Sequence, residues 1–186
     1  MSQTALPLLL EIAPPTWPGV IKRVEPWLAT VSTLQATYRE MLEDTVPDVD
    51  EPHLRTYLED LLAIARDHEA QIDDLYRAFG LEHGGSGAVK VAATLVAKTR
   101  QAVGHVEGLA GGAKGSAWRK LRELLLSNLD AISGFAVAEQ LGLALGNPGV
   151  VAVAFPIVEQ KTEHQLLLRE IFLEMAANAI LYERDV

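Results

Sequence analysis

Two histidines and a glutamate interrupt hydrophobic helical faces in this sequence and could bind a metal ion. His68 lies in the middle of one apolar face, His164 in the middle of another, and Glu139 on a third. A buried carboxylate costs several kcal/mol unless it is paired, hydrogen-bonded, protonated or metal-bound. Imidazole and carboxylate groups are ordinary ligands of zinc, iron and manganese. The three residues are therefore candidate metal ligands from three helices.

The same residues also fit arrangements that involve no metal. Each histidine could pack in the core, and Glu139 could pair with His68 or His164 or reach solvent at its helix end. The standard di-iron bundle carries two E-x-x-H pairs, whereas no glutamate here has a histidine three residues later. The first predicted helix has no carboxylate on its apolar face, because Glu40 and Glu43 lie beside that face. These two absences argue against oxidase or ferroxidase chemistry.

Other catalytic motifs are incomplete. GGAKGS lacks the order of a phosphate-binding loop, and no strand precedes it. The zinc motif H-E-x-x-H is absent, since His68 and Glu69 are followed by Ala70, Gln71 and Ile72. The spacing of the serine, histidine and aspartate residues does not exclude Ser-His-Asp catalysis, although there is no G-x-S-x-G nucleophile elbow. No motif therefore identifies a reaction.

The elements that would position these residues are predicted to be helices. Turn-forming Pro, Gly and Asp clusters separate five apolar-periodic stretches, roughly 20–44, 52–79, 88–107, 116–145 and 150–183. Four of them repeat apolar residues every three, four or seven positions, as one helix face does. The apolar face of the fourth reads Trp118, Leu121, Leu125, Ile132, Ala136, Glu139 and Leu143, with Asn128 near its edge. The segment VVAVAF at 150–155 is strand-like in composition or forms a first helical turn before Pro156.

The predicted fold is all-α, a ferritin-like four-helix bundle in one domain, residues 1–186. Long helices bury narrow apolar faces best by packing nearly antiparallel. The turn GNPG at 146–149 is short enough to make the last two helices antiparallel neighbours. Residues 1–19 form an N-terminal arm, and residues 80–116 form a long crossover with its own helix. Two hairpins joined by one long crossover is a connectivity of ferritin-like bundles.

Composition limits the class of protein further. The chain has 186 residues, 16 Lys and Arg against 25 Asp and Glu, a net charge of −9 and no cysteine. The acidic total argues against nucleic-acid binding, and the lack of cysteine excludes disulfides and thiol catalysis. Seven basic residues and one acidic residue give segment 88–122 a charge of +6. This basic segment meets an anionic partner at the crossover, associates with an acidic face of another copy, or is a solvated face with locally biased charge.

The sequence contains no signal for a membrane. The apolar run from Leu6 to Ile12 lacks a positive n-region and a cleavage site, and three prolines follow it. No stretch approaches the roughly 20 apolar residues that a spanning helix needs. We therefore expect a cytoplasmic protein.

Three segments carry a family resemblance. VEQKTEHQLL (158–167), DHEAQIDDLYRAFG (67–80) and SGFAVAEQLGLALG (133–146) resemble helices of the bacterial ferritin-like stress proteins of the YciE/YciF type. The resemblance covers about half of the chain. It implies a ferritin-like bundle that dimerises and binds iron or manganese between its helices. It makes Glu159 the ligand of the last helix and puts Thr162 where the wider superfamily has histidine, whereas the apolar face points to His164.

Three hypotheses about function follow. In the first, the chain is a homodimeric ferritin-like bundle with an altered or vestigial metal site formed by His68, Glu139, Glu159 and His164, and it binds iron or manganese in a stress response. In the second, the bundle holds no metal and acts as a structural or interaction protein through its surfaces. The third is a small-molecule pocket between helices, for which the sequence has no residue signature. The absent first-helix carboxylate favours the second.

Overall fold

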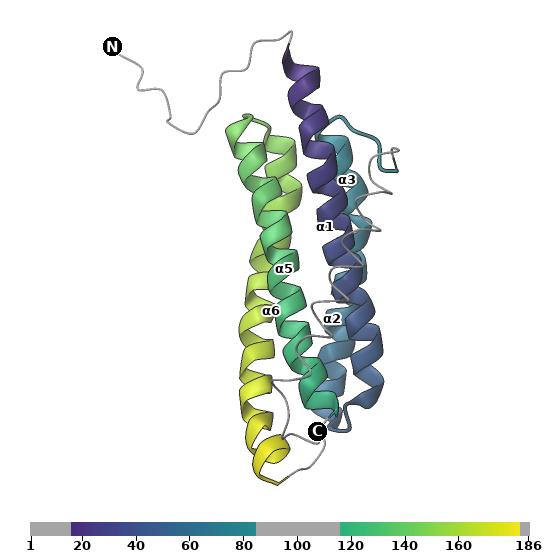
Figure 1. Ribbon diagram of the computed structural model, residues 1–186, viewed down its shortest axis with the longest axis vertical. Helices are drawn as coiled ribbons and strands as arrows, with labels where there is room; N and C mark the ends of the chain where they lie inside the picture. Colours follow the sequence, from purple (N-terminus) through teal and green to yellow (C-terminus); the bar gives the residue numbers. More distant parts are fainter. Residues whose placement is uncertain (1–15, 85–115, 183–186) are drawn as a thin grey trace, which may run out of the picture.

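The protein is a bundle of long helices (Figure 1). The computed structural model describes residues 16–84 and 116–182, and these ranges contain helices and no strand. The elements are α1 (Trp17–Thr45), the short 3-10 helix η2 (Val46–Asp48), α2 (Pro52–Ala70), α3 (Ile72–Ala78), α5 (Ser116–Ala144) and α6 (Pro148–Leu181). The prediction of an all-α fold is therefore confirmed for the described residues.

The helices run lengthwise beside one another. α1 and α2 form one antiparallel pair, and α5 and α6 form a second (Figure 1). α5 packs along both α6 and α1, and the Trp27 indole N–H donates to the Gly134 carbonyl at 3.3 Å. α3 continues the line of α2 and ends at the upper end of the bundle, whereas α5 begins at the lower end.

The predicted helix bounds hold to within a few residues. The stretch 52–79 is divided at Gln71 into α2 and α3, and the strand-like segment 150–155 lies inside α6. α1 begins at Trp17, so the end of the predicted arm 1–19 is helical. The rest of that arm and the predicted crossover helix at 88–107 lie outside the described residues.

The predicted apolar face of α5 is wrong by about one residue position. The side chains at its centre are Leu121, Leu124, Asn128, Ala131, Phe135 and Ala138, all at most 1% exposed. Ile132 and Glu139 lie at the border of this face, and Leu143 is 41% exposed. α5 packs against both α1 and α6. The small residues at its centre, Ala131 and Ala138, allow close contact between the helices but contribute little to a hydrophobic pattern.

The turn between α5 and α6 is built by local chemistry. Gly146 has φ +62°, a conformation that favours glycine at the end of a helix. The Asn147 side chain then caps α6 by accepting from the backbone N–H groups of Gly149 and Val150. Its amide group also donates to the Ala78 carbonyl at 2.8 Å. The predicted short turn, with antiparallel neighbours on either side, is confirmed.

Gly142 is required by the close approach of α5 and α6. A Cβ atom there would lie 2.7 Å from Val150 Cγ1 and 2.8 Å from Val150 Cβ. We expect Gly142→Ala to lower the free energy of unfolding by about 1–3 kcal/mol, measured by urea denaturation. Gly19→Ala is the control, because nothing lies within 4 Å of its added Cβ. Equal stability of the two variants would contradict this close packing.

The hydrophobic core consists of two clusters along the bundle. One includes Val31, Ile72, Phe135 and Ile157, and the other includes Tyr38, Leu61, Leu124 and Leu168. Each of α1, α5 and α6 contributes to both clusters, with one stretch of the helix in each cluster. α2 and α3 together form the fourth long line of helix, and α3 contributes to the first cluster whereas α2 contributes to the second. A short stretch separates the two clusters in every case, and the buried polar residues of the described ranges lie there, apart from Thr45 at the end of α1.

The described residues cover only part of the chain for which we predicted a basic segment and no membrane-spanning helix. Four of the seven basic residues of segment 88–122 lie outside them. Of the others, Lys120 donates to Asp48 at 2.5 Å and to the Asp44 carbonyl at 2.8 Å, so part of this charge is neutralised within the chain. Among residues 16–84 and 116–182 we find no helix with the length and apolar character needed to cross a membrane.

Candidate functional site

Four polar side chains lie in the core, each in the stretch of its helix between the two hydrophobic clusters. Gln35 of α1, His68 of α2, Asn128 of α5 and Lys161 of α6 are each at most 3% exposed. We call these four residues the polar layer. In the part of the chain that the structure describes, the other buried polar residues are Thr33 and Thr45, whose hydroxyls donate to carbonyls of their own helix. The polar layer is therefore where side chains from four different helices could act together.

Lys161 is buried, and no carboxylate of residues 16–84 and 116–182 pairs with it. Its side chain is 1% exposed, and its Nζ donates to Asn128 Oδ1 at 3.2 Å. Nζ also lies 4.1 Å from the centre of the Tyr38 ring, a cation–π contact. Burial lowers the pKa of Lys161 to about 7 from the usual 10.5. Among the described residues, a neutral amide and an aromatic face are the groups that stabilise the ammonium group.

Amide side chains connect the helices on both sides of Lys161. Asn128 Nδ2 donates to the Lys161 carbonyl at 3.1 Å and to Gln165 Oε1 at 2.8 Å, and Gln165 donates to the Leu125 carbonyl. These bonds hold α5 against α6. On the opposite side, Gln35 Nε2 donates to the Ala65 carbonyl at 2.8 Å and holds α1 against α2.

His68 is neutral and held by α6. Its Nε2 lies 2.9 Å from Gln160 Oε1, which accepts, so the ring proton is on Nε2 and Nδ1 is an acceptor. Burial and then the charge of Lys161 lower the pKa of His68 to about 4. His164 is half-buried, and burial followed by the same lysine lowers its pKa as well. His68, Lys161 and His164 are thus electrostatic neighbours.

Three buried polar atoms of this region have no hydrogen-bond partner among the described residues. They are Gln35 Oε1, the Tyr38 hydroxyl and His68 Nδ1. Each unsatisfied group costs about 1–3 kcal/mol unless water or another polar group reaches it. The polar layer therefore lowers the free energy of unfolding, as functional or vestigial sites often do.

The four predicted metal ligands do not come together as a cluster. His68 is in the core and His164 is half-buried near it, whereas Glu139 is at the border of α5 and Glu159 is exposed. Within residues 16–84 and 116–182, no group of three or more His, Cys, Asp and Glu residues is placed to hold a metal ion. Glu40 and Glu43, which lie beside the apolar face of the first helix, both pair with Arg39.

The donors of the polar layer do not suit iron or manganese. Carboxylates are the usual partners of imidazole at such sites, and here two amides and an amine take their place. A protonated Lys161 also repels a cation at short range. The described residues therefore do not fit a resident iron or manganese ion at this level of the bundle.

Lys161 and Gln35 are functional candidates that the hydrophobic pattern misses, although a signal for both exists. Lys161 lies four residues after Ile157 and seven before Leu168, so it continues their helical face. Gln35 lies four residues after Val31 and seven before Leu42 in the same way. A hydrophobic pattern passes over both positions because their side chains are polar.

The low pKa of His68 predicts acid sensitivity. Between the unfolded value near 6.5 and the folded value of about 4, the unfolded chain binds more protons, so the free energy of unfolding falls as the pH falls. We expect His68→Leu to remove this part of the acid dependence in urea denaturation. His53→Leu is the control, because His53 is 68% exposed. The same acid dependence in both variants would contradict the assignment.

Comparison of the chain with protein-family models, with curated proteins and with solved structures finds no match.

Proposed function

We propose that this protein is a ferritin-like bundle with a vestigial metal site, and that it works without iron or manganese, through its surfaces, as a cytoplasmic homodimer. The observation that carries the proposal is the buried Lys161 at the centre of a layer formed by all four long helical lines. The arrangement favours the metal-free hypothesis over a working oxidase.

The residues of the polar layer can be aligned with the ligand positions of a di-iron bundle. In such bundles one glutamate comes from each of two helices, and an E-x-x-H pair comes from each of the other two. Gln35 and Asn128 would stand at the single-glutamate positions. The two pairs would be Ala65-x-x-His68 and Lys161-x-x-His164. On this alignment both histidines are kept and all four carboxylates are replaced.

The hydrogen bonds support placing these residues at one level. Gln35 bonds to the backbone of Ala65, and Asn128 bonds to both the backbone and the amine of Lys161. The replacements remove four negative charges and add one positive charge. The amides maintain hydrogen-bonded contacts between the helices.

Metal loading tests this proposal directly. The purified chain is incubated with ferrous iron in air and with manganese, passed through a desalting column and analysed for metal. We expect retention no higher than that of a matched protein without a site. Retention of about one or two ions per chain, lost together in His68→Ala and His164→Ala, would overturn the metal-free function.

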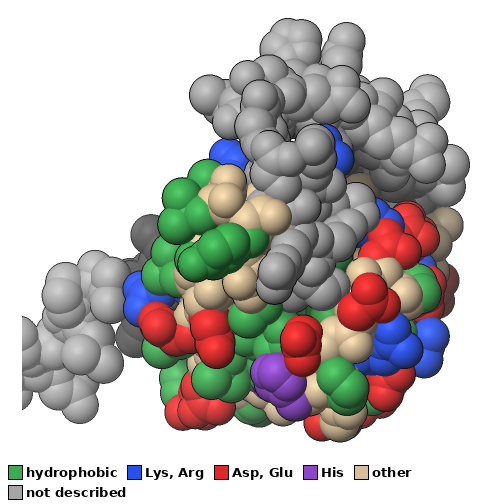
Figure 2. Space-filling view, turned by 90° about the horizontal axis from the view of Figure 1, so that it is seen from below, with side chains coloured by type: hydrophobic (Ala, Val, Ile, Leu, Met, Phe, Trp, Pro, Cys, Tyr) green, Lys and Arg blue, Asp and Glu red, His purple; other side chains and the backbone are tan. Residues whose placement is uncertain are grey.

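Exposed hydrophobic side chains support self-association through α5 and α6. They include Leu126, Leu129 and Val137 of α5 and Phe155, Leu166, Leu173 and Ile180 of α6, each at least 40% exposed. α1 contributes only Trp17 to the exposed large hydrophobic residues of the described ranges, and α2 contributes none. The end view in Figure 2 shows hydrophobic side chains on the side of α5 and α6. A face of this kind suits an interface better than solvent.

We expect Leu129→Asp to shift the dimer toward monomer in light scattering coupled to size exclusion. The new carboxylate would lose its hydration if that face were buried. Ala63→Asp is the control, because Ala63 is exposed on α2. A wild-type chain that is monomeric at all concentrations would refute the dimer.

A further inference from the structure

Outside the polar layer, three side chains form a hydrogen-bonded chain in the order of a hydrolase triad. Ser32 Oγ of α1 lies 3.5 Å from His83 Nε2, and His83 Nδ1 lies 2.5 Å from Asp73 Oδ1 of α3. With Nδ1–H donated to Asp73, Nε2 is left to accept the serine proton. A nucleophile, its base and a group that orients the base are the recurring parts of covalent catalysis, and contacts in free enzymes are often long.

The chain after α3 is built to bring His83 to this position. Gly80 has φ +72° at the end of α3, and the backbone N–H of Leu81 donates to the Tyr76 carbonyl at 3.0 Å. This glycine-dependent helix end turns the chain back toward α1. The His83 ring also stacks on the buried Tyr76 ring, with centroids 4.6 Å apart. Asp73 and Tyr76 together fix the orientation of the imidazole.

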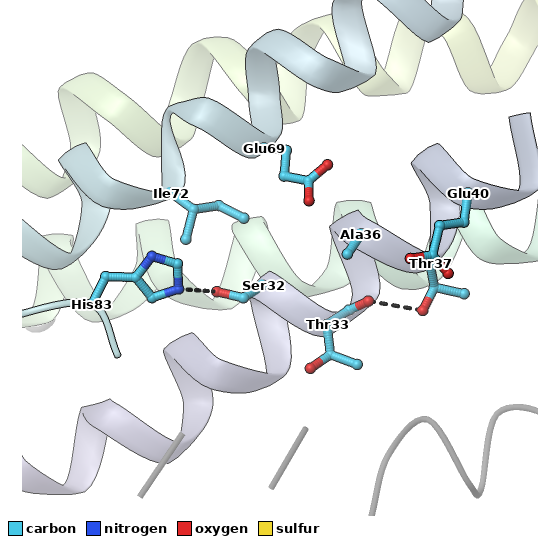
Figure 3. Close-up of a pocket in the computed structure, with 8 residues that line it drawn as sticks. All are labelled: Ser32, Thr33, Ala36, Thr37, Glu40, Glu69, Ile72 and His83. Carbon is cyan, nitrogen blue, oxygen red and sulfur yellow. Dashed lines mark hydrogen bonds between the residues drawn. The ribbon is translucent and has the colours of Figure 1, made fainter. Parts of the chain in front are cut away.

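The Ser32 side chain opens into a surface groove of about 290 Å³. Figure 3 shows Ser32 and His83 pointing toward each other at one end of the groove, with Glu69 and Glu40 farther along. Ile72 and Ala36 give it an apolar wall. The groove is therefore large enough for a small acyl group beside the serine hydroxyl.

We propose that Ser32, His83 and Asp73 form a weak esterase site for small, neutral, activated esters. Ser32 Oγ bonds to the ester carbonyl carbon while its proton passes to His83 Nε2. The carbon–oxygen bond to the alcohol then breaks, and the leaving oxygen takes the proton from His83. Water attacks the acyl-serine in the second step, passes a proton to His83, and releases the carboxylic acid as Ser32 Oγ regains a proton.

The charges of the groove define the substrate class. Glu40 and Glu69 line it, and Glu43 lies beside them. Arg39 pairs with all three carboxylates, at 3.4, 2.7 and 2.7 Å for Glu40, Glu69 and Glu43, and Arg66 pairs with Glu43. Three carboxylates against two guanidinium groups leave this end negative, so a neutral acyl ester is favoured over an anionic one.

The position of Ser32 limits the reaction to esters with good leaving groups. Ser32 lies in the middle of α1, where backbone N–H groups are used by the helix itself, so they cannot serve as an oxyanion hole. General-base catalysis alone contributes about 10²–10⁴-fold. An ester of an acidic phenol needs little further help, whereas an amide needs more than this site supplies.

Hydrolysis of p-nitrophenyl acetate by the full chain tests the proposal. We expect Ser32→Ala and His83→Ala each to lower the enzyme-dependent kcat/KM by about 10²-fold. His53→Ala is the matched control, because His53 is another exposed histidine beside a carboxylate, 3.8 Å from Glu51. Relative to its own hydrolysis in buffer, the anionic ester 4-acetoxybenzoate should be accelerated less than the neutral ester, a comparison that corrects for the different leaving groups. A fluorophosphonate probe should label Ser32, as located by peptide mass spectrometry.

Asp73 is a positioning residue and needs its own measurement. Asp73→Asn should lower kcat with little change in KM, and Asp73→Glu should recover part of the loss, because a carboxylate again accepts from Nδ1–H. Unchanged hydrolysis in Ser32→Ala would mean that imidazole acts alone and would overturn the proposal. Labelling at a residue other than Ser32, or equal losses in His53→Ala and His83→Ala, would overturn it as well.

Discussion

The variant that combines Gln35→Glu, Ala65→Glu, Asn128→Glu and Lys161→Glu is expected to bind about two manganese or ferrous ions per chain. The changes create E-x-x-H pairs at 65–68 and 161–164 and add one carboxylate to each of α1 and α5. Four buried carboxylates repel one another, so the metal-free variant should be far less stable than the wild type. Manganese at about 100 times its Kd should then add about 2.7 kcal/mol per site.

The measurement is metal content together with the thermal midpoint, with and without manganese. The first control keeps Lys161 and carries the other three glutamates, and it should retain less metal because the ammonium stays in the layer. The second adds His68→Ala and His164→Ala to the four glutamates and should lose the metal. A variant with all four glutamates that shows neither retained metal nor a manganese-dependent rise in midpoint would contradict the ferritin-like frame, whatever the wild type binds.

Lys161→Met is expected to stabilise the protein at neutral and acidic pH. The pKa of Lys161 is about 7 in the folded chain and near 10.5 when the lysine is exposed. Between these values the unfolded chain binds more protons, so the wild-type free energy of unfolding rises with pH across this window. The cost of the buried amine is therefore fully present below pH 7 and is relieved toward pH 10.5. Replacing a buried charge with an apolar side chain of similar shape often stabilises by about 1–4 kcal/mol.

Urea denaturation of wild type and variant at several pH values measures this effect. The difference should be largest below pH 7 and should shrink as the pH approaches 10.5. Lys120→Met is the control, because Lys120 is 35% exposed and pairs with Asp48 at the surface. A surface pair contributes about 0–1 kcal/mol, so this variant should change stability little. A wild type whose stability does not depend on pH in this window would contradict a buried, unpaired amine.

The two proposals are independent of one another. The polar layer lies in the core, whereas Ser32, His83 and Asp73 lie at the surface between α1 and the end of α3. The four-glutamate variant leaves Ser32, His83 and Asp73 in place. Failure of the esterase assay would therefore leave the metal-free bundle unaffected.

His68 illustrates how far the sequence leads toward the core site. Its place on an apolar helical face predicts burial, and the structure confirms that burial. The same pattern predicts a place on the apolar face for Glu139, yet Glu139 lies at the border of α5 because the buried face is rotated toward smaller residues. The pattern gives no such prediction for Lys161, although Lys161 has the same periodic position as its buried neighbours. A charged side chain carries no hydrophobic signal, so only packing reveals that it is buried.

The helices and the turn that joins α5 to α6 can be predicted from the amino-acid sequence alone. They depend on contacts within a few residues, such as the three- and four-residue repeats of apolar side chains and the Gly146–Asn147 cap. Which side of each helix is buried, and which polar groups meet, is known only once the helices are packed together. Gln35 reaches a carbonyl 30 residues away, and Ser32 reaches a ring 51 residues away. Such contacts depend on the rotation and spacing of whole helices, which are set by the packing of all their neighbours together.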